Sequence, residues 1–140
     1  MSEARWQHYD HGADIGVRGM GRSKAEAFEQ AALALTAVMF DPAGIRGSER
    51  VRVTCEAPDD ELLLADWLNA LIYRMTTRNL ALGRFRVRID GHRLAGEARG
   101  EKLDPARHRA AVEVKGATYT TLRVAQEPDG TWIAQTVVDV

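Results

Sequence analysis

The sequence predicts a single α+β domain in which two amphipathic helices pack on mixed or antiparallel β-structure. Two segments, at about 24–40 and 60–77, repeat apolar residues every three or four positions, which is the helical period. The segments around them alternate apolar and polar residues, which is typical of strands. The chain has 140 residues without an internal repeat or linker, so we expect one compact domain over residues 1–140.

The N-terminal part is expected to form a hairpin followed by the first helix. Residues 4–9 and 14–20 have strand character and are separated by a turn-forming cluster, so they are expected to pair. Ser23 and Glu26 have the spacing of a capping box, in which each side chain accepts a hydrogen bond from the backbone of the other residue. The helix therefore begins after Ser23, and it ends before Pro42.

The second helix and the remaining strands follow in order. A strand at about 51–55 ends at Pro58, and the acidic residues Asp59, Asp60 and Glu61 favour a helix start because they oppose the positive end of the helix dipole. The rest of the chain is expected to be β, with strands at 84–90, 93–100, 112–114, 119–126 and 132–138.

Composition narrows the function class. The net charge is −1, so the whole molecule lacks the positive field that drives sequence-independent nucleic-acid binding. The single cysteine, Cys55, excludes an internal disulfide and a multi-cysteine metal site, and it is expected in the core. No apolar run approaches the length of a membrane span, so we expect a cytoplasmic protein with no membrane partner. The oligomeric state stays open, a monomer included.

The densest polar cluster comprises His8, Asp10, His11 and Asp14, next to Gly12. Imidazoles suit zinc or iron, whereas carboxylates suit calcium, magnesium or manganese, so the cluster does not fix the metal. Ordinary turn and capping roles are the alternative interpretation, with His8 assigned a structural role. A small metal-dependent hydrolase is one function that such a cluster could serve.

The last two residues add carboxylates to this cluster. A strand that ends at Asp139 and Val140 offers one side-chain carboxylate and one free main-chain carboxylate. If the first hairpin lies beside the closing strand, Asp14, Asp139 and Val140 form an all-oxygen site suited to a hard divalent ion. Without a cation, the negative groups would repel one another.

Basic and aromatic residues give weaker signals. Arg84, Arg86 and Arg88 project from one strand face, joined by Arg93 and Arg99, and could bind a phosphate backbone or an acidic protein patch. The alternative is a solvated sheet face. His92 and His108 lie in polar turns and are expected to be solvated, although His108 could also help to contact a partner. The sequence has no Gly-rich phosphate loop and no signposted catalytic triad, so it gives no independent case for an enzyme.

Five blocks in order, and the end of the chain, resemble the archease family. Trp6–Gly16 matches its N-terminal signature, and Gly12 and Thr120 are departures, at positions where the family commonly has threonine and histidine. The other matching segments are Ser23–Phe28, Asp66–Asn69 with Leu71 and Tyr73, Gly100–Asp104 with His108, Glu113–Lys115 with Thr118 and Tyr119, and the Asp139–Val140 ending.

The resemblance implies a non-catalytic activator of RtcB-type tRNA-splicing RNA ligases. These enzymes join a 3′-phosphate or 2′,3′-cyclic phosphate end to a 5′-hydroxyl with GTP and manganese. Archeases promote guanylylation of the ligase and its multiple turnover, and the resemblance implies calcium binding by Asp14, Asp139 and Val140. The family is also linked to chaperone action on a tRNA cytosine methyltransferase, which is the alternative function.

The partner surface is expected to combine basic residues in and outside the matching blocks. We expect RNA to be contacted mainly through the ligase. The cation is expected to be calcium, with manganese or magnesium as alternatives. The candidate partner-binding residues are Lys102, His108, Lys115, Arg86 and Arg88.

Overall fold

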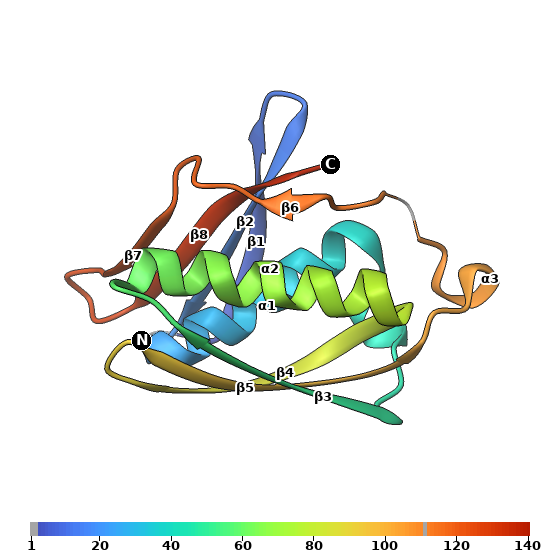
Figure 1. Ribbon diagram of the computed structural model, residues 1–140. Coiled ribbons are helices and arrows are strands. Elements are labelled where there is room, and N and C mark those ends of the chain that lie inside the picture. Colours follow the sequence, from blue (N-terminus) through green and yellow to red (C-terminus); the bar gives the residue numbers. More distant parts are fainter. Residues whose placement is uncertain (1–2, 111) are drawn as a thin grey trace.

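The computed structural model describes residues 3–110 and 112–140 and has two antiparallel sheets with two long helices between them (Figure 1). The expected domain of 1–140 is therefore described except for residues 1–2 and 111. α1 (Lys24–Met39) packs on strands of both sheets, and α2 (Asp60–Arg78) lies beside it. The predicted α+β class and both helices are confirmed, with helix bounds within one residue of those expected.

The first sheet gathers strands from the two ends of the chain. β1 (Arg5–His11) and β2 (Asp14–Gly21) form the expected hairpin, and β2 then pairs with the closing strand, β8 (Trp132–Asp139). Two short strands, β6 (Gly116–Ala117) and β7 (Arg123–Gln126), complete the sheet by pairing with β8.

The second sheet comes from the middle of the chain. Its order is β3 (Glu49–Glu56), β5 (Arg93–Lys102) and β4 (Leu80–Asp90), and β4 and β5 form a hairpin with Gly91 at its turn. One face of this sheet is buried against the helices, while alternate residues point to solvent. Two short helical segments complete the fold, η1 (Pro42–Gly44) and α3 (Pro105–His108).

The helices begin where the capping residues predict. Ser23 accepts a hydrogen bond from Glu26 N, as expected for the cap. The Glu26 carboxylate accepts from Arg22 N, one residue before the cap, so the reciprocal bond of the expected capping box is shifted by one residue. Asp59 caps α2 by accepting from Leu62 N at 2.8 Å. Asn79 ends α2 in the left-handed conformation, with φ 53°.

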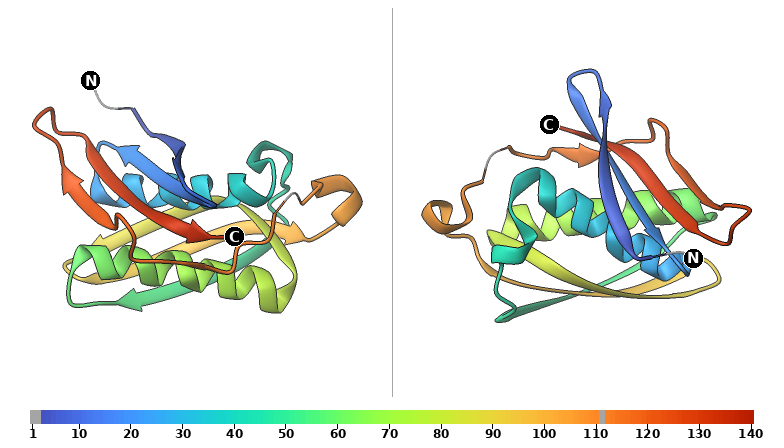
Figure 2. Two further views of the ribbon diagram at one scale, coloured as in Figure 1. Left: turned by 90° about the horizontal axis from the view of Figure 1, so that it is seen from above. Right: turned by 180° about the vertical axis from the view of Figure 1, so that it is seen from behind.

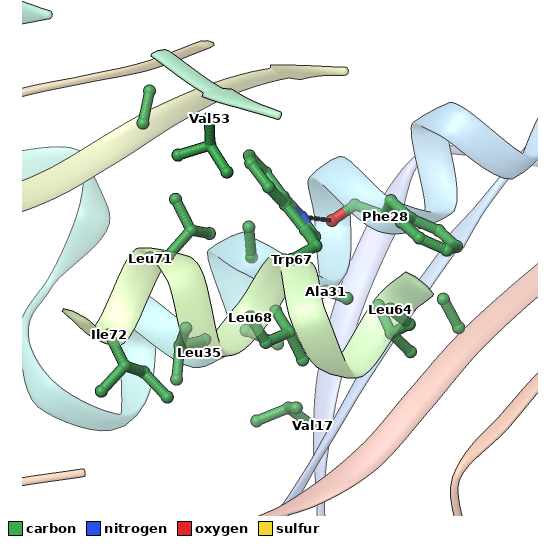
Figure 3. Packing of buried hydrophobic residues seen from close by; sticks show 14 of the residues in the cluster. Val17, Phe28, Ala31, Leu35, Val53, Leu64, Trp67, Leu68, Leu71 and Ile72 are labelled. Atoms are coloured by element: carbon green, nitrogen blue, oxygen red, sulfur yellow. Dashed lines mark hydrogen bonds between the residues drawn. The ribbon is translucent and has the colours of Figure 1, made fainter. Parts of the chain in front are cut away.

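Trp67 of α2 occupies the middle of the core (Figure 3). Its side chain is fully buried, and its Nε1 donates to the carbonyl of Phe28 in α1 at 3.2 Å. Phe85 of β4 meets the indole edge to face, and Gly96 of β5 lies against it. One side chain thus joins both helices and the second sheet.

Two carboxylates on the helices cap free strand edges. Glu29 of α1 accepts from Val87 N at 2.8 Å, and Glu61 of α2 accepts from Val124 N at 3.1 Å. These bonds satisfy backbone donors that no neighbouring strand reaches. Burial raises the pKa of Glu29, and the hydrogen bond from Val87 N partly offsets this rise.

Two of the expected strands are wrong. The strand expected at 112–114 is absent from the described residues, and the strand expected at 119–126 begins only at Arg123. Residues 112–115 are irregular, and residues 119–122 form a turn before β7, in which Thr121 has φ 51°. Isolated main-chain bonds to β8 hold the backbone beside the turn, since Thr118 N donates to Val137 O and Val137 N donates to Thr120 O. In the described part of the chain, no helix has the length and apolar character needed to cross a membrane.

Candidate metal site at the hairpin tip

The pairing of β2 with β8 brings Asp14 to the end of the chain. Ile15 lies opposite Val138 in this ladder, so Asp14 is level with the last two residues. Val140 N donates to Asp14 Oδ1 at 3.4 Å. The expected adjacency of the first hairpin and the closing strand is therefore confirmed.

The tip of the β1–β2 hairpin projects from the body of the molecule, and the end of β8 crosses beside it (Figure 2). Asp139 is exposed, whereas Asp14 and Val140 are half-buried. On the other side of β8, Lys115 N donates to Asp139 O at 2.8 Å, so the predicted partner residue Lys115 also lies at this tip. The tip is therefore the part of the molecule that combines projecting carboxylates with a lysine.

Backbone conformation and one aromatic ring hold the hairpin in place. Gly12 has φ +63°, a left-handed value that glycine adopts without strain. This conformation suits a glycine at a position where the family commonly has threonine. Tyr9 lies across Gly16, its cross-strand partner, and its hydroxyl is 2.6 Å from Thr121 Oγ1. The Arg18 guanidinium lies 4.5 Å from the Tyr9 ring centroid. These contacts tie the hairpin to the turn that precedes β7.

The donors at the tip suit a hard cation. Asp14 and Asp139 supply carboxylate oxygens, and Val140 supplies main-chain oxygens. In residues 3–110 and 112–140, no basic side chain forms an ion pair with either aspartate. Oxygen-only donors with uncompensated charge fit calcium, magnesium or manganese better than zinc. Two side chains are too few for a closed site, so water or a partner would supply the remaining ligands.

The predicted cluster of His8, Asp10, His11 and Asp14 does not come together as a group. His8 Nε2 donates to the carbonyl of Ala34 at 2.7 Å, which confirms its structural role. Asp10 and His11 are exposed, and across the described residues no three His, Cys, Asp or Glu side chains gather to hold a metal. The hydrolase interpretation thereby loses the site on which it depended.

His108 was expected to be solvated, which is wrong. Its side chain is only 1% exposed, packs against Phe40, and lies 3.3 Å from Glu101 Oε2. The ring Nδ1 accepts from Asp104 N at 2.8 Å, a local bond that closes α3. The sequence pattern could not reveal this, because the groups that enclose the ring come from the end of α1 and from β5.

Glu101 is the centre of the same network. It accepts hydrogen bonds from Arg107 and from Arg46 N, and the Arg107 bond in particular lowers the pKa of Glu101 to about 2. Lys102, the next residue, donates from Nζ to Arg78 O at the end of α2. Lys102 and His108 thus lie near α3, while Arg86 and Arg88 lie on the second sheet, apart from the hairpin tip (Figure 1).

Comparison with known proteins decides the family. The model of the archease protein family (MTH1598/TM1083) matches residues 6–140. The chain belongs to the archease family.

Archease relatives match over nearly the whole chain. Protein archease of Pyrococcus furiosus is 41% identical and that of Thermococcus gammatolerans 44%, each match covering 97% of this chain and 99% of the relative. The solution structure of Methanobacterium thermoautotrophicum protein 1598 is 32% identical, with a TM-score of 0.84 over 96% of this chain and 98% of that one.

A second solved archease shows the same fold. The crystal structure from Thermotoga maritima, described as a possible chaperone, is 21% identical with a TM-score of 0.66, covering 96% of both chains. At this identity, the likeness extends to the fold alone.

Two residues of the archease blocks have structural roles that sequence reasoning missed. Asn69 of α2 accepts from Ala117 N at 2.9 Å and donates to Ala117 O, so it holds β6 beside the hairpin tip. Glu101 holds α3 and the loop at Arg46, as described above. The presence of both residues in matching blocks was the available signal. Thr120 stands where the family commonly has histidine. Its contact with β8 is made by the main chain, because the Thr120 carbonyl accepts from Val137 N.

Proposed function

We propose that this chain is a non-catalytic activator of an RtcB-type RNA ligase and that it acts through a divalent cation, calcium first among the candidates, held by Asp14, Asp139 and Val140. The proposal rests on archease membership together with one observation. The β2–β8 pairing sets Asp14 beside the last residues of β8, on a tip that extends from the body of the protein.

The shape of the tip supports a role at another protein's active site. A hairpin that projects beyond its sheet can enter a cleft, whereas the rest of the first sheet is broad (Figure 2). The Tyr9–Thr121 contact and the Asn69–Ala117 bonds brace the hairpin and β6 against neighbouring segments, and such bracing would lower the entropy lost on docking.

The residues of the tip would have two roles, which are to bind the cation and to present positive charge to the ligase. Asp14 and Asp139 would orient the cation by their carboxylates, and Lys115 would offer a positive charge to phosphate oxygens on the ligase. A bound divalent cation would neutralise the carboxylates and supply positive charge to the docked surface. Docking would favour the ligase conformation that accepts the guanylyl group, since the activator binds that conformation more tightly.

Multiple-turnover RNA joining by a cognate RtcB-type ligase tests the proposal. The wild-type chain should raise the number of turnovers, Asp14→Asn should abolish this effect, and Asp10→Asn should retain it. Asp10 is the matched control because it is an exposed carboxylate on the same hairpin outside the donor set. Equal activation by both variants would remove the cation from the proposal, and no activation by the wild type would favour chaperone action on a tRNA cytosine methyltransferase.

A further inference from the structure

The outer face of the second sheet carries a concentration of arginines. Alternation along β3, β4 and β5 directs seven exposed arginines to solvent, away from the helices. Arg93 lies in the end row between Glu56 and Asp90 and pairs with Glu56, whereas the other six lie together. We call this surface the arginine face. Its residues are Arg50, Arg52, Arg84, Arg86, Arg88 and Arg99.

Strand register sets these side chains in rows. Arg50, Arg99 and Arg84 lie opposite one another across the three strands, and the next row is Arg52, Glu97 and Arg86. Neighbouring strands are about 4.8 Å apart, and successive residues on one face are separated by about 6.7 Å along a strand. The result is a two-dimensional array of guanidinium groups rather than a single charged strand.

Glu97 is the acid that lies among these six arginines, and the end row of the same sheet face adds Glu56 and Asp90 beside Arg93. Glu97 lies 2.7 Å from Arg50 Nε and 3.5 Å from Arg99 Nη2, so it holds two of them. Among the described residues, the other four make no ion pair. The arginine face is therefore strongly positive in a chain whose net charge is −1. A positive region on a slightly negative molecule orients it toward a polyanion.

A hollow in the arginine face has room for a phosphate group. Its volume is about 270 Å³, and it is lined by Arg84, Phe85, Arg86, Glu97 and Arg99. Guanidinium groups bind phosphate oxygens through paired N–H donors, a geometry that lysine lacks. The arginine face contains no lysine.

The chemistry of the arginine face favours a nucleic acid over a protein. Protein interfaces have an apolar centre, whereas the uncharged residues pointing outward between these arginines are Thr54 and Ala95. Interfaces with nucleic acid are polar and positively charged. Phe85 borders the hollow, but its ring packs edge to face on Trp67, so β4 presents no free aromatic ring for stacking on unpaired bases.

The shape of the arginine face favours double-helical RNA. Reading the major groove of B-DNA requires an inserted helix or ribbon, and the arginine face is the side of a three-stranded sheet (Figure 1). RNA duplexes present a wide, shallow minor groove bordered by phosphates, which a broad surface can contact. We propose that the arginine face binds the phosphate backbone of double-helical RNA. This inference does not rest on the ligase proposal.

Fluorescence anisotropy with a labelled RNA duplex of about 16 base pairs tests the inference, with EDTA present and no ligase. If the four unpaired arginines contact phosphates, the affinity falls on the order of 100-fold between about 50 and 200 mM salt. Arg52→Glu/Arg86→Glu should weaken binding at least about tenfold, and Arg86→Gln should lower the salt slope by about one.

The matched control changes the same charge on the first sheet. Arg5→Glu/Arg123→Glu replaces two exposed arginines of β1 and β7 and should bind RNA as the wild type does. Circular dichroism melts confirm that each variant is folded. Unchanged binding by Arg52→Glu/Arg86→Glu, or an equal loss in the control, would overturn the proposal. Equal or tighter binding of a DNA duplex of the same sequence would overturn the assignment to RNA.

Discussion

The contact between Gly96 and Trp67 predicts a strong energetic coupling in the core. A Cβ atom at Gly96 would lie 2.4 Å from Trp67 Cζ3 and 2.7 Å from Cη2. The indole cannot move away cheaply, because it is fully buried, bonded to Phe28 O and packed on Phe85. Gly96→Ala should therefore lower the free energy of unfolding by about 1–3 kcal/mol, the usual cost of overpacking.

The smaller ring introduced by Trp67→Phe removes the two indole atoms that a Cβ at position 96 would meet. We expect the Gly96→Ala change to cost at least about 1 kcal/mol less in the Trp67→Phe background, which makes the pair non-additive. Urea denaturation of the wild type, the two single variants and the double variant, followed by circular dichroism, gives the coupling energy. Equal costs of Gly96→Ala in the two backgrounds would refute the steric argument.

Three further predictions concern ion binding and titration. Calcium at about 100 times its Kd should stabilise the wild type and Asp10→Asn by about 2.7 kcal/mol in thermal melts, and a similar gain in Asp14→Asn would contradict the site. The pKa of Glu101 is about 2 in the folded protein and 4.5 ordinarily, so the stability it contributes is present above pH 4.5 and is lost as the pH falls toward 2. Urea midpoints of Glu101→Gln should fall less than those of the wild type over this window, and parallel curves would argue against the network. Burial raises the pKa of the half-buried Cys55 to about 11, so a thiol reagent at pH 7 should label it much more slowly in the folded protein than after unfolding, and equal rates would disprove this.

Local signals predicted the elements that depend on local chemistry. The capping residues Ser23 and Asp59 placed both helix starts, because a cap acts within one turn. The segments 112–115 and 119–122 were misjudged, because only the two residues of β6 between them form a ladder with β8, and single main-chain bonds flank that ladder. The division of the strands into two sheets also depends on contacts between segments far apart in the sequence.

The candidate site was predicted in part. The resemblance and the carboxylates pointed to Asp14 and Asp139, and the strand pairing they required is present. His108 was misjudged because a polar local sequence does not reveal enclosure by Phe40 and Glu101. The Tyr9–Thr121 contact joins residues 112 positions apart, and no local pattern could have indicated it.

Single-turnover guanylylation of a purified cognate RtcB-type ligase, with GTP and metal, tests the central claim most directly. The wild-type chain should accelerate formation of the guanylylated ligase, and Asp139→Ala should not, because it removes a carboxylate from the tip without disturbing the core. Acceleration by Asp139→Ala equal to that of the wild type would contradict activation through the carboxylates of the hairpin tip.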